Sequence, residues 1–352
     1  MRLSDRLLAF LPVLLVGGAG IGILMRPSVA VAPGIAALVL AVVVAVLAEL
    51  RLRKVVPVES HGRLARWRHP SPNPLARILD GIASSRLLSA WIEPLPIVAM
   101  VSDIEDVVYV SYLVEAEKLT PYVPWGLELQ RLGPSGQYAL FSFLTYRHGH
   151  FGFRFLGPLR RLMPSPVQTN WRIHVRDPRT GIDGIYFITN AIDHAGPALG
   201  ARLFTEGMPM HVFARSSIVR DPTNGRGVFE LSPGNGTAPD AKGSLLPCEK
   251  PIFEGEWHAC FESYEDFLAY TVPQNRAMSA QPWHHRVTRH EIELPIAIEK
   301  CEPLEGTVTS RTAESIVGDA KPVCFRVAGL FFTFSEELHD PVPAEPKPVS
   351  QA

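Results

Sequence analysis

The chain has 352 residues, with 34 basic and 35 acidic side chains and a formal net charge of −1. This length allows one large domain with additional segments. A near-neutral composition excludes a protein that holds nucleic acid or another polyanion by bulk charge. No CxxC spacing occurs, which favours reduced thiols over a zinc site or a disulfide framework for the four cysteines, Cys248, Cys260, Cys301 and Cys324.

Two apolar segments open the chain, at about 7–25 and 29–48. Each is long enough for a helix that crosses a hydrocarbon core of roughly 30 Å. Only three residues, 26–28, separate them, so two spans would have to run antiparallel. We therefore predict a transmembrane helical hairpin over residues 1–50, in contact with membrane lipids.

Basic residues orient this hairpin. Arg2 and Arg6 precede the first segment, and Arg, Lys and His residues are frequent from Arg51 to Arg68. The positive-inside rule then places the N-terminus and everything after the second span in the cytoplasm. The alternative for the first segment is a cleaved signal peptide. Cleavage would still leave the second segment as an anchor.

Residues 51–96 form a basic linker that ends in an amphipathic pattern. The linker charges would lie near anionic lipid headgroups. Apolar residues then recur mostly at helical spacing from Leu75 to Ile92. We predict a helix there, which either lies on the bilayer or covers one end of the following domain.

The periodicity changes over residues 97–338. Short aromatic and β-branched runs bounded by Gly, Pro, Asn and Asp predict strands, at Val108–Val114, Tyr138–Tyr146, Trp171–Arg176, Gly184–Ile192, His211–Val219, Gly227–Leu231, Arg286–Glu299 and Val323–Phe334. Helical patterns are few and short, near Glu115–Tyr122, Gly196–Thr205 and Ser263–Tyr270. We predict a mainly β (α+β) domain whose antiparallel sheet closes or stacks to protect its edges. Residues 339–352 are Pro-rich and are predicted to be a disordered tail.

Polar side chains are concentrated between Asn170 and Ser217. In Trp171–Arg176, alternation puts Arg172, His174 and Arg176 on one strand face and the apolar residues on the other. The polar face is either an ordinary solvated surface or the lining of a barrel that suits an anion. Tyr186 could add a hydroxyl.

Arg202 and His211 flank a turn at Pro209, and His211 is either structural or an acid/base group. The other histidines, among them His148, His150 and His290, lack the helical spacing of a zinc hydrolase, and no GxSxG motif is present. The sequence therefore predicts no metal site and no cofactor.

Four stretches resemble one known group of proteins: LVEAEKLTPYVPWGLEL at Leu113–Leu129, Asn170-x-Arg172, GIYFITNAID at Gly184–Asp193 and GARLFTEGMPMHVFAR at Gly200–Arg215. Over roughly residues 105–335 the chain resembles uncharacterised bacterial proteins classed as a domain of unknown function in the acetoacetate decarboxylase-like superfamily. The resemblance implies a mainly antiparallel, cone-like β-barrel with an internal pocket. It also makes Asn170 a candidate pocket residue.

The residues depart from the decarboxylase pattern at its reactive group. The resemblance implies a Gly-x-Pro-Lys-Lys motif whose first lysine forms a Schiff base, but this chain has Gly207-Met208-Pro209-Met210-His211. Methionine cannot form an imine, and histidine is not an amine nucleophile. Among the few lysines of the domain, Lys300 is the best substitute, although a surface lysine is the simpler interpretation. The decarboxylase mechanism is therefore not carried over.

Three functional hypotheses follow. The first is a binding module that holds a small, partly apolar anion against Asn170, Arg172, Tyr186, Arg202 and His211. The second is a lyase or related enzyme without a Schiff base, in which His211 is the acid/base and Arg172 and Arg202 stabilise negative charge. The third is a membrane-tethered scaffold with a filled interior. The sequence does not determine the oligomeric state, the ligand or whether a reaction occurs.

Overall fold

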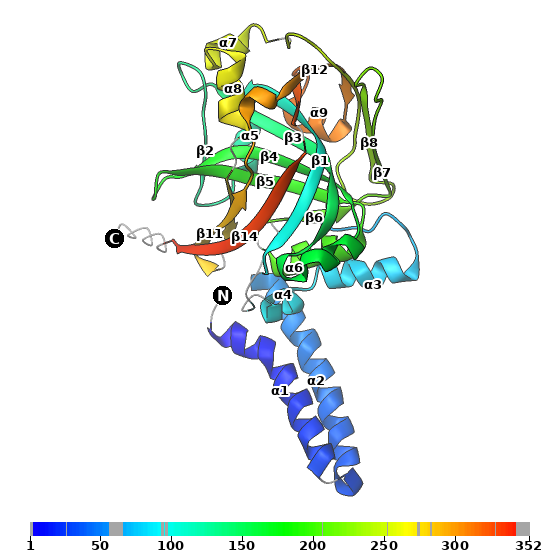
Figure 1. Cartoon of the computed structure of the whole chain (residues 1–352). Helices are drawn as coiled ribbons and strands as arrows, with labels where there is room; N and C mark the ends of the chain where they lie inside the picture. The colour runs from blue at the N-terminus through cyan, green and yellow to red at the C-terminus, as the bar shows by residue number, and fades with distance from the viewer. Residues whose placement is uncertain are drawn as a thin grey trace, which may run out of the picture.

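The computed structural model of the chain describes residues 3–25, 27–55, 66–92, 95, 98–205, 207–251, 253–272, 275–281, 284–327 and 329–342 (Figure 1). The helices are α1 Leu3–Met25, α2 Pro27–Val55, α3 Pro74–Ala83, α4 Arg86–Ile92, α5 Ala116–Leu119, α6 Ala195–Phe204, α7 Glu256–Cys260, α8 Tyr264–Thr271 and α9 Arg311–Val317, with short 3-10 helices η2 Thr120–Tyr122, η3 Arg154–Leu162 and η5 Ile298–Lys300. The strands are β1 Met100–Glu115, β2 Glu128–Leu129, β3 Tyr138–Phe153, β4 Val167–Asp177, β5 Ile182–Ile192, β6 Met210–Val212, β7 Arg215–Arg220, β8 Gly227–Ser232, β9 Ala241–Pro247, β10 Arg276–Gln281, β11 Arg286–Glu293, β12 Glu302–Thr309, β13 Val323–Val327 and β14 Leu330–Pro341.

The N-terminal helices α1 and α2 lie side by side and project from one end of the sheet domain (Figure 1). Asp5 of α1 is buried and accepts a hydrogen bond from Arg51 of α2 at 3.0 Å. In the part of the chain that the structure describes, one segment, Pro33–Lys54, is long and apolar enough to cross a membrane. The helical pair is thus present, and its membrane-capable helix coincides with the predicted span at 29–48, while the predicted span at 7–25 is not shown to cross a membrane.

The single helix predicted between Leu75 and Ile92 is two helices, α3 and α4, separated at Ser84 and Ser85. The break is stabilised from α2: Glu49 accepts hydrogen bonds from Leu87 N at 2.8 Å and from the Ser85 hydroxyl at 3.1 Å. A carboxylate at a helix N-terminus satisfies amides that have no partner within the helix. The α2 helix therefore holds α4 against the end of the domain.

The described strands form one mixed sheet in the order β14-β11-β10-β5-β4-β3-β1-β13-β12-β9-β8-β7, with β2 beside β4 and β6 beside β5. Every pairing is antiparallel except β5–β10 and β5–β6, so the predicted mainly antiparallel sheet is confirmed. β14 also pairs with β1, from Met100 opposite Phe334 to Ile104 opposite Leu330. This pairing closes a ring through β1, β3, β4, β5, β10, β11 and β14, which leaves fewer open strand edges.

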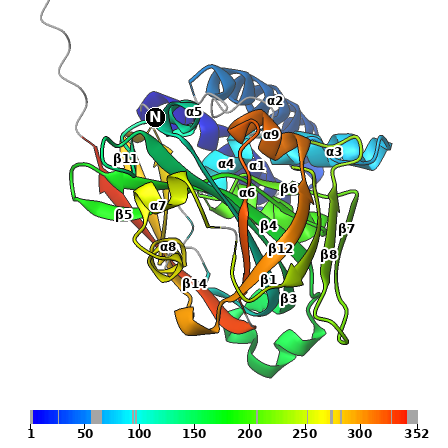
Figure 2. The same cartoon turned by 90° about the horizontal axis from the view of Figure 1, so that it is seen from above.

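Beyond β1 the sheet continues outside this ring through β13, β12, β9, β8 and β7. β7 and β8 lie on one side of β1 and β4, and β11 and β14 lie on the other (Figures 1 and 2). Both faces of the central strands are consequently buried. On one face, Trp171 is fully buried and stacks on Phe143, with ring centroids 4.4 Å apart. Phe229 of β8 covers Phe143 edge-on at 6.4 Å.

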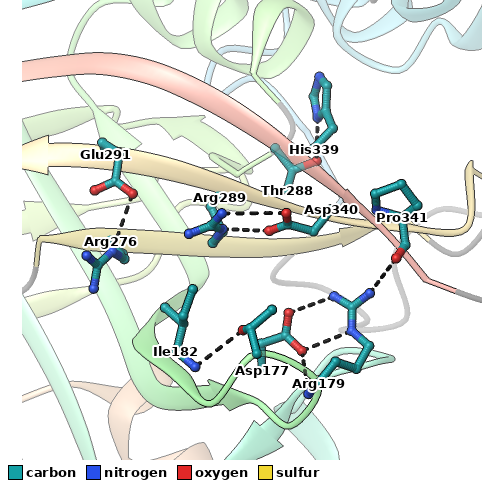
Figure 3. Close-up of polar contacts among 11 residues, drawn as sticks. Asp177, Arg179, Ile182, Arg276, Thr288, Arg289, Glu291, His339, Asp340 and Pro341 are labelled. Atoms are coloured by element: carbon teal, nitrogen blue, oxygen red, sulfur yellow. Dashed lines mark hydrogen bonds and ion pairs between the residues drawn. The ribbon is translucent and has the colours of Figure 1, made fainter.

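Figure 3 shows how the turn between β4 and β5 is held. The buried carboxylate of Asp177 accepts two hydrogen bonds from the Arg179 side chain, at 2.6 and 2.9 Å. Arg179 also donates to the carbonyl of Pro341 at 2.7 Å. β14 continues past Leu338 to Pro341, so the start of the predicted disordered tail is part of the sheet. Residues 343–352 lie outside the described residues.

Several strand boundaries differ from the prediction. The segment His211–Val219 is two strands, β6 and β7, because the chain leaves β5 after Val212 and pairs with β8 from Arg215. The segment Val323–Phe334 is likewise β13 and β14, and β11 ends at Glu293 instead of Glu299. β9, β10, β12 and the two-residue strand β2 were not predicted.

Candidate functional site

The two faces of β4 both lie in the interior. Arg172 and His174 are 2% exposed, and Trp171 on the opposite face is completely buried. The interpretation of the polar face as a solvated surface is therefore wrong for these two residues and holds only for Arg176 at the strand end, which is exposed and paired with Asp183. A buried polar face requires internal partners, because an unpaired buried charge is costly.

A cavity of about 40 Å³ lies on the Arg172 face, inside the ring of strands. This is room for about three water molecules. Its wall is mainly aliphatic and aromatic: Ile104, Val107, Tyr109, Leu144, Tyr146, Asn170, Arg172, Ile185, Phe187, Met208, Ile292, Leu294, Ile296, Leu330, Phe332 and Phe334. Within the described residues, no lysine lines it, and Lys300 is exposed on η5.

Arg172 is the cation of this cavity. One of its terminal nitrogens donates to the carbonyl of Thr271 at 3.1 Å, and its guanidinium lies 5.2 Å from the centre of the Tyr109 ring. Its Nε atom is buried and has no hydrogen-bond acceptor among the described residues, nor does any described carboxylate form an ion pair with it. Burial lowers the pKa of Arg172, and Tyr109 opposes this shift. Since arginine remains protonated in proteins, the cavity contains a buried positive charge without an anion.

His174, next to Arg172 on the same strand face, is held in a different way. Its ring stacks on Tyr270 of α8, with centroids 4.5 Å apart and planes 16° apart. Burial and then the charge of Arg172 lower the pKa of His174 well below its usual value. His174 is therefore neutral, and it leaves Arg172 as the cation of this face.

Amide and hydroxyl groups line the cavity beside Arg172. Asn170 donates to the Tyr146 hydroxyl at 3.1 Å. The Asn170 carbonyl oxygen accepts from Gln168 at 2.8 Å and from Asn190 at 2.7 Å. Asn170 therefore uses both ends of its amide within the protein. Burial raises the pKa of Tyr146, so its phenol stays protonated and can act as a hydrogen-bond donor.

The chain of hydrogen bonds continues from Gln168 to His148. His148 Nε2 donates to the Gln168 side-chain oxygen at 2.9 Å, and its Nδ1 lies 2.8 Å from the Ser102 hydroxyl. Because an amide oxygen only accepts, the proton of the neutral ring is on Nε2, and Nδ1 accepts from Ser102. Burial lowers the pKa of His148 to about 4. At neutral pH the histidine is therefore an uncharged member of this network.

The other residues predicted for the site lie elsewhere. Tyr186 pairs in register with Ile173 and packs in the core on the Trp171 side of the sheet, so it does not face the cavity. Arg202 of α6 donates to the carbonyl of Met210 at 3.0 Å and lies 5.8 Å from the Trp67 ring centre. Both contacts are at the end of the domain that carries α3 and α4.

His211 is fully buried but is not part of the cavity wall. Its register partner on β5 is Ala191, in the Trp171-side core, and its Nδ1 lies 2.8 Å from the Thr237 hydroxyl. Thr237 in turn accepts from the Arg68 amide at 2.9 Å. The structure thus brings Asn170 and Arg172 together and separates both from Tyr186, Arg202 and His211.

Sequence reasoning missed Tyr109, Tyr146, Gln168 and Asn190 as neighbours of Arg172. Tyr109 and Tyr146 lie within predicted strands that contain other polar residues as well, so the sequence does not distinguish them. The register among β1, β3, β4 and β5 is needed to bring them to one place.

Comparison with known proteins gave no match among curated sequences. Among solved structures, an acetoacetate decarboxylase from Legionella pneumophila is similar at 12% identity and a TM-score of 0.47, over 68% of this chain and 86% of that one. An acetoacetate decarboxylase-like enzyme from Sphingomonas wittichii RW1 is similar at 8% identity and a TM-score of 0.49, over 69% and 94%. The enduracididine biosynthesis enzyme MppR, complexed with pyruvate, is similar at 15% identity and a TM-score of 0.46, over 69% and 90%.

These similarities assign no substrate to this chain. A family model matches residues 102–317, from the start of β1 to the end of α9, which is more than half of the sequence. This range contains β3, β4 and β5, and with them the Arg172 side of the cavity. The chain therefore belongs to the DUF2071 family, described as an uncharacterised conserved protein.

Proposed function

We propose that the barrel binds a short-chain carboxylic acid, with the carboxylate against Arg172 and the hydrocarbon part against the apolar wall. One observation carries this proposal: Arg172 is buried, charged and without an acidic partner among the described residues. A guanidinium that has given up its hydration gains most from an oxyanion, because charge-assisted hydrogen bonds are about twice as strong as neutral ones. Tyr146 offers a second donor at the same wall.

The size of the cavity limits the ligand. Room for about three water molecules fits an acid of roughly two to four carbon atoms. A ligand of about six heavy atoms can gain at most roughly 1.5 kcal/mol per atom. We therefore expect micromolar to millimolar dissociation constants, as for a sensor or carrier of an abundant metabolite.

Matched pairs of ligands test this function. In calorimetric titrations of the full-length protein in detergent, propionate and butyrate should bind, and propionamide and butyramide of the same shape should not. Equal binding of acid and amide would show that the guanidinium is not the recognition group. Borohydride reduction with an oxo-acid should leave the protein mass unchanged, because no lysine of the described cavity wall can form an imine.

The alternative enzymatic function receives no support from the geometry. It requires His211 beside Arg172 and Arg202, whereas His211 bonds to Thr237 on the other side of β5 and β6. Of the neutral groups near Arg172, Asn170 is held by Tyr146, Gln168 and Asn190, and His148 is held by Gln168 and Ser102. Binding is therefore the function that this cavity supports best.

We further propose that α1 and α2 anchor the protein as a two-pass hairpin with both ends in the cytoplasm. The membrane-capable segment of α2, the antiparallel packing of α1 along it and the basic residues on the domain side support this arrangement. A C-terminal green fluorescent fusion should fluoresce in bacterial cells, and a C-terminal alkaline phosphatase fusion should be inactive. Active phosphatase, or a mature chain that lacks α1, would contradict the two-pass topology.

A further inference from the structure

Helix α3 differs from an ordinary surface helix in the residues that it exposes. Leu75 and Ile78, three residues apart, are 62% and 60% exposed, and Arg77 between them is also exposed. The opposite side carries the buried Ala76. A helix that only covers the end of a domain directs its apolar residues inward and its polar residues to water.

The helix is nevertheless firmly built. Asn73 caps it by accepting from the Ala76 amide at 2.7 Å, and Pro74 occupies its first turn. Asp80 accepts from the His69 amide at 2.7 Å, which ties α3 to the preceding linker. Its exposed apolar residues are thus presented by a fixed element.

The position of α3 indicates what covers this face. α3 contacts α6, and α6 contacts α4, which Glu49 of the membrane-capable helix holds in place. Figure 1 shows α3 lying across the axis of α1 and α2, at the level where these helices reach the domain. A helix at this level and in this direction would lie along the surface of a bilayer that α2 crosses.

Basic side chains near α3 would be attracted to an anionic lipid surface. Arg77 is exposed on the side of α3 next to the apolar pair, and Arg66 and Arg68 are exposed on the linker that leads into α3. Basic residues near the membrane are attracted to anionic headgroups. An exposed Leu and Ile combined with Arg on one short helix is the pattern of elements that lie in the interface.

We infer that α3 is a second membrane contact, with Leu75 and Ile78 inserted into an anionic lipid surface beside the hairpin. The inference rests on the proposed anchoring by α2. With this second contact, the barrel has a fixed orientation relative to the bilayer. Its α6 end faces the bilayer at a fixed distance, and the α7–α8 end faces away (Figure 1).

Quenching by brominated lipid tests this contact in the full chain. Single tryptophans are introduced by Ile78→Trp or Leu75→Trp on α3, by Val42→Trp at a 64% exposed position of α2, and by Ala269→Trp at an exposed position of α8. Each variant is reconstituted into vesicles of phosphatidylcholine and phosphatidylglycerol with or without brominated chains. Emission is compared with that of the parent chain, and circular dichroism confirms folding.

We expect at least half of the added emission to be lost for the variants at positions 42, 75 and 78, and less than a tenth for the variant at 269. Quenching at 42 without quenching at 75 and 78 would overturn the inference and leave the anchor intact. Absence of quenching at 42 would overturn the anchor and the inference together. Equal quenching at 269 would overturn the fixed orientation of the barrel.

Discussion

Replacement of Arg172 by methionine should weaken acid binding strongly and leave the protein at least as stable. The methionine fills a similar volume, and it removes a buried charge that no described acidic group balances. Replacement of buried charges by apolar residues of similar size is often neutral or stabilising by about 1–4 kcal/mol. Loss of one strong charged contact should weaken binding by a factor of about 100, since 1.4 kcal/mol corresponds to a factor of ten. Titration calorimetry and denaturant unfolding measure the two effects on the same samples.

Two control variants separate recognition from general electrostatics. Arg176→Met removes an arginine from the same strand, but this side chain is exposed and paired with Asp183, so binding should be unchanged. Arg172→Lys keeps the charge and loses the planar donor set, so it should bind with intermediate affinity. If the Arg172→Met variant binds acids as the parent does, the carboxylate does not contact this residue and the proposed site is wrong.

Acidification should destabilise the barrel through His148, by about 3 kcal/mol between pH 7 and pH 4. Burial lowers the pKa of this histidine from 6.5 to about 4 in the folded protein. The unfolded chain therefore takes up the proton first as the pH falls, so the stabilisation is complete above pH 6.5 and is lost as the pH approaches 4. Each unit of pKa difference corresponds to about 1.4 kcal/mol.

The variant His148→Asn isolates this contribution. It forfeits hydrogen bonds to Ser102 and Gln168 at every pH, so its stability is lower at pH 7. The difference between the parent and the variant should then shrink by about 3 kcal/mol as the pH falls to 4, and it should be constant above pH 7.5. Denaturant unfolding followed by tryptophan fluorescence gives both curves. A difference that does not depend on pH would mean that folding does not shift the pKa of His148.

Local patterns in the sequence were sufficient for much of the architecture. Alternation in Trp171–Arg176 correctly placed Arg172 and His174 on one face, because successive side chains of a strand point in opposite directions. The short helices near Gly196–Thr205 and Ser263–Tyr270 were also correct, and Ser263 caps its helix by accepting from Asp266 N at 3.1 Å. The expected membership of an uncharacterised domain family is confirmed by the match over residues 102–317.

Strands without an apolar pattern were missed. β9, β10 and β12 contain Gly, Ser, Arg, Lys or Glu at several positions. Their position comes from backbone pairing with strands far away in the chain, such as Leu304 opposite Pro247 and Ala277 opposite Ile185. Such pairing depends on neighbouring strands and leaves little trace in a single strand's composition.

The sequence by itself determined that this chain combines an apolar N-terminal segment with a β-rich domain, and that Met210 and His211 follow Pro209 where the family resemblance led us to expect lysines. Only the tertiary structure decided which polar residues meet. Alternation of side chains along a strand defines two faces, but it does not tell which face encloses a cavity. The bulge between Trp171 and Arg172 also changes which β5 residues lie opposite β4. Asn170 and Arg172 therefore share a cavity with Tyr109 and Tyr146, while Tyr186 and His211, on the opposite face, do not reach it.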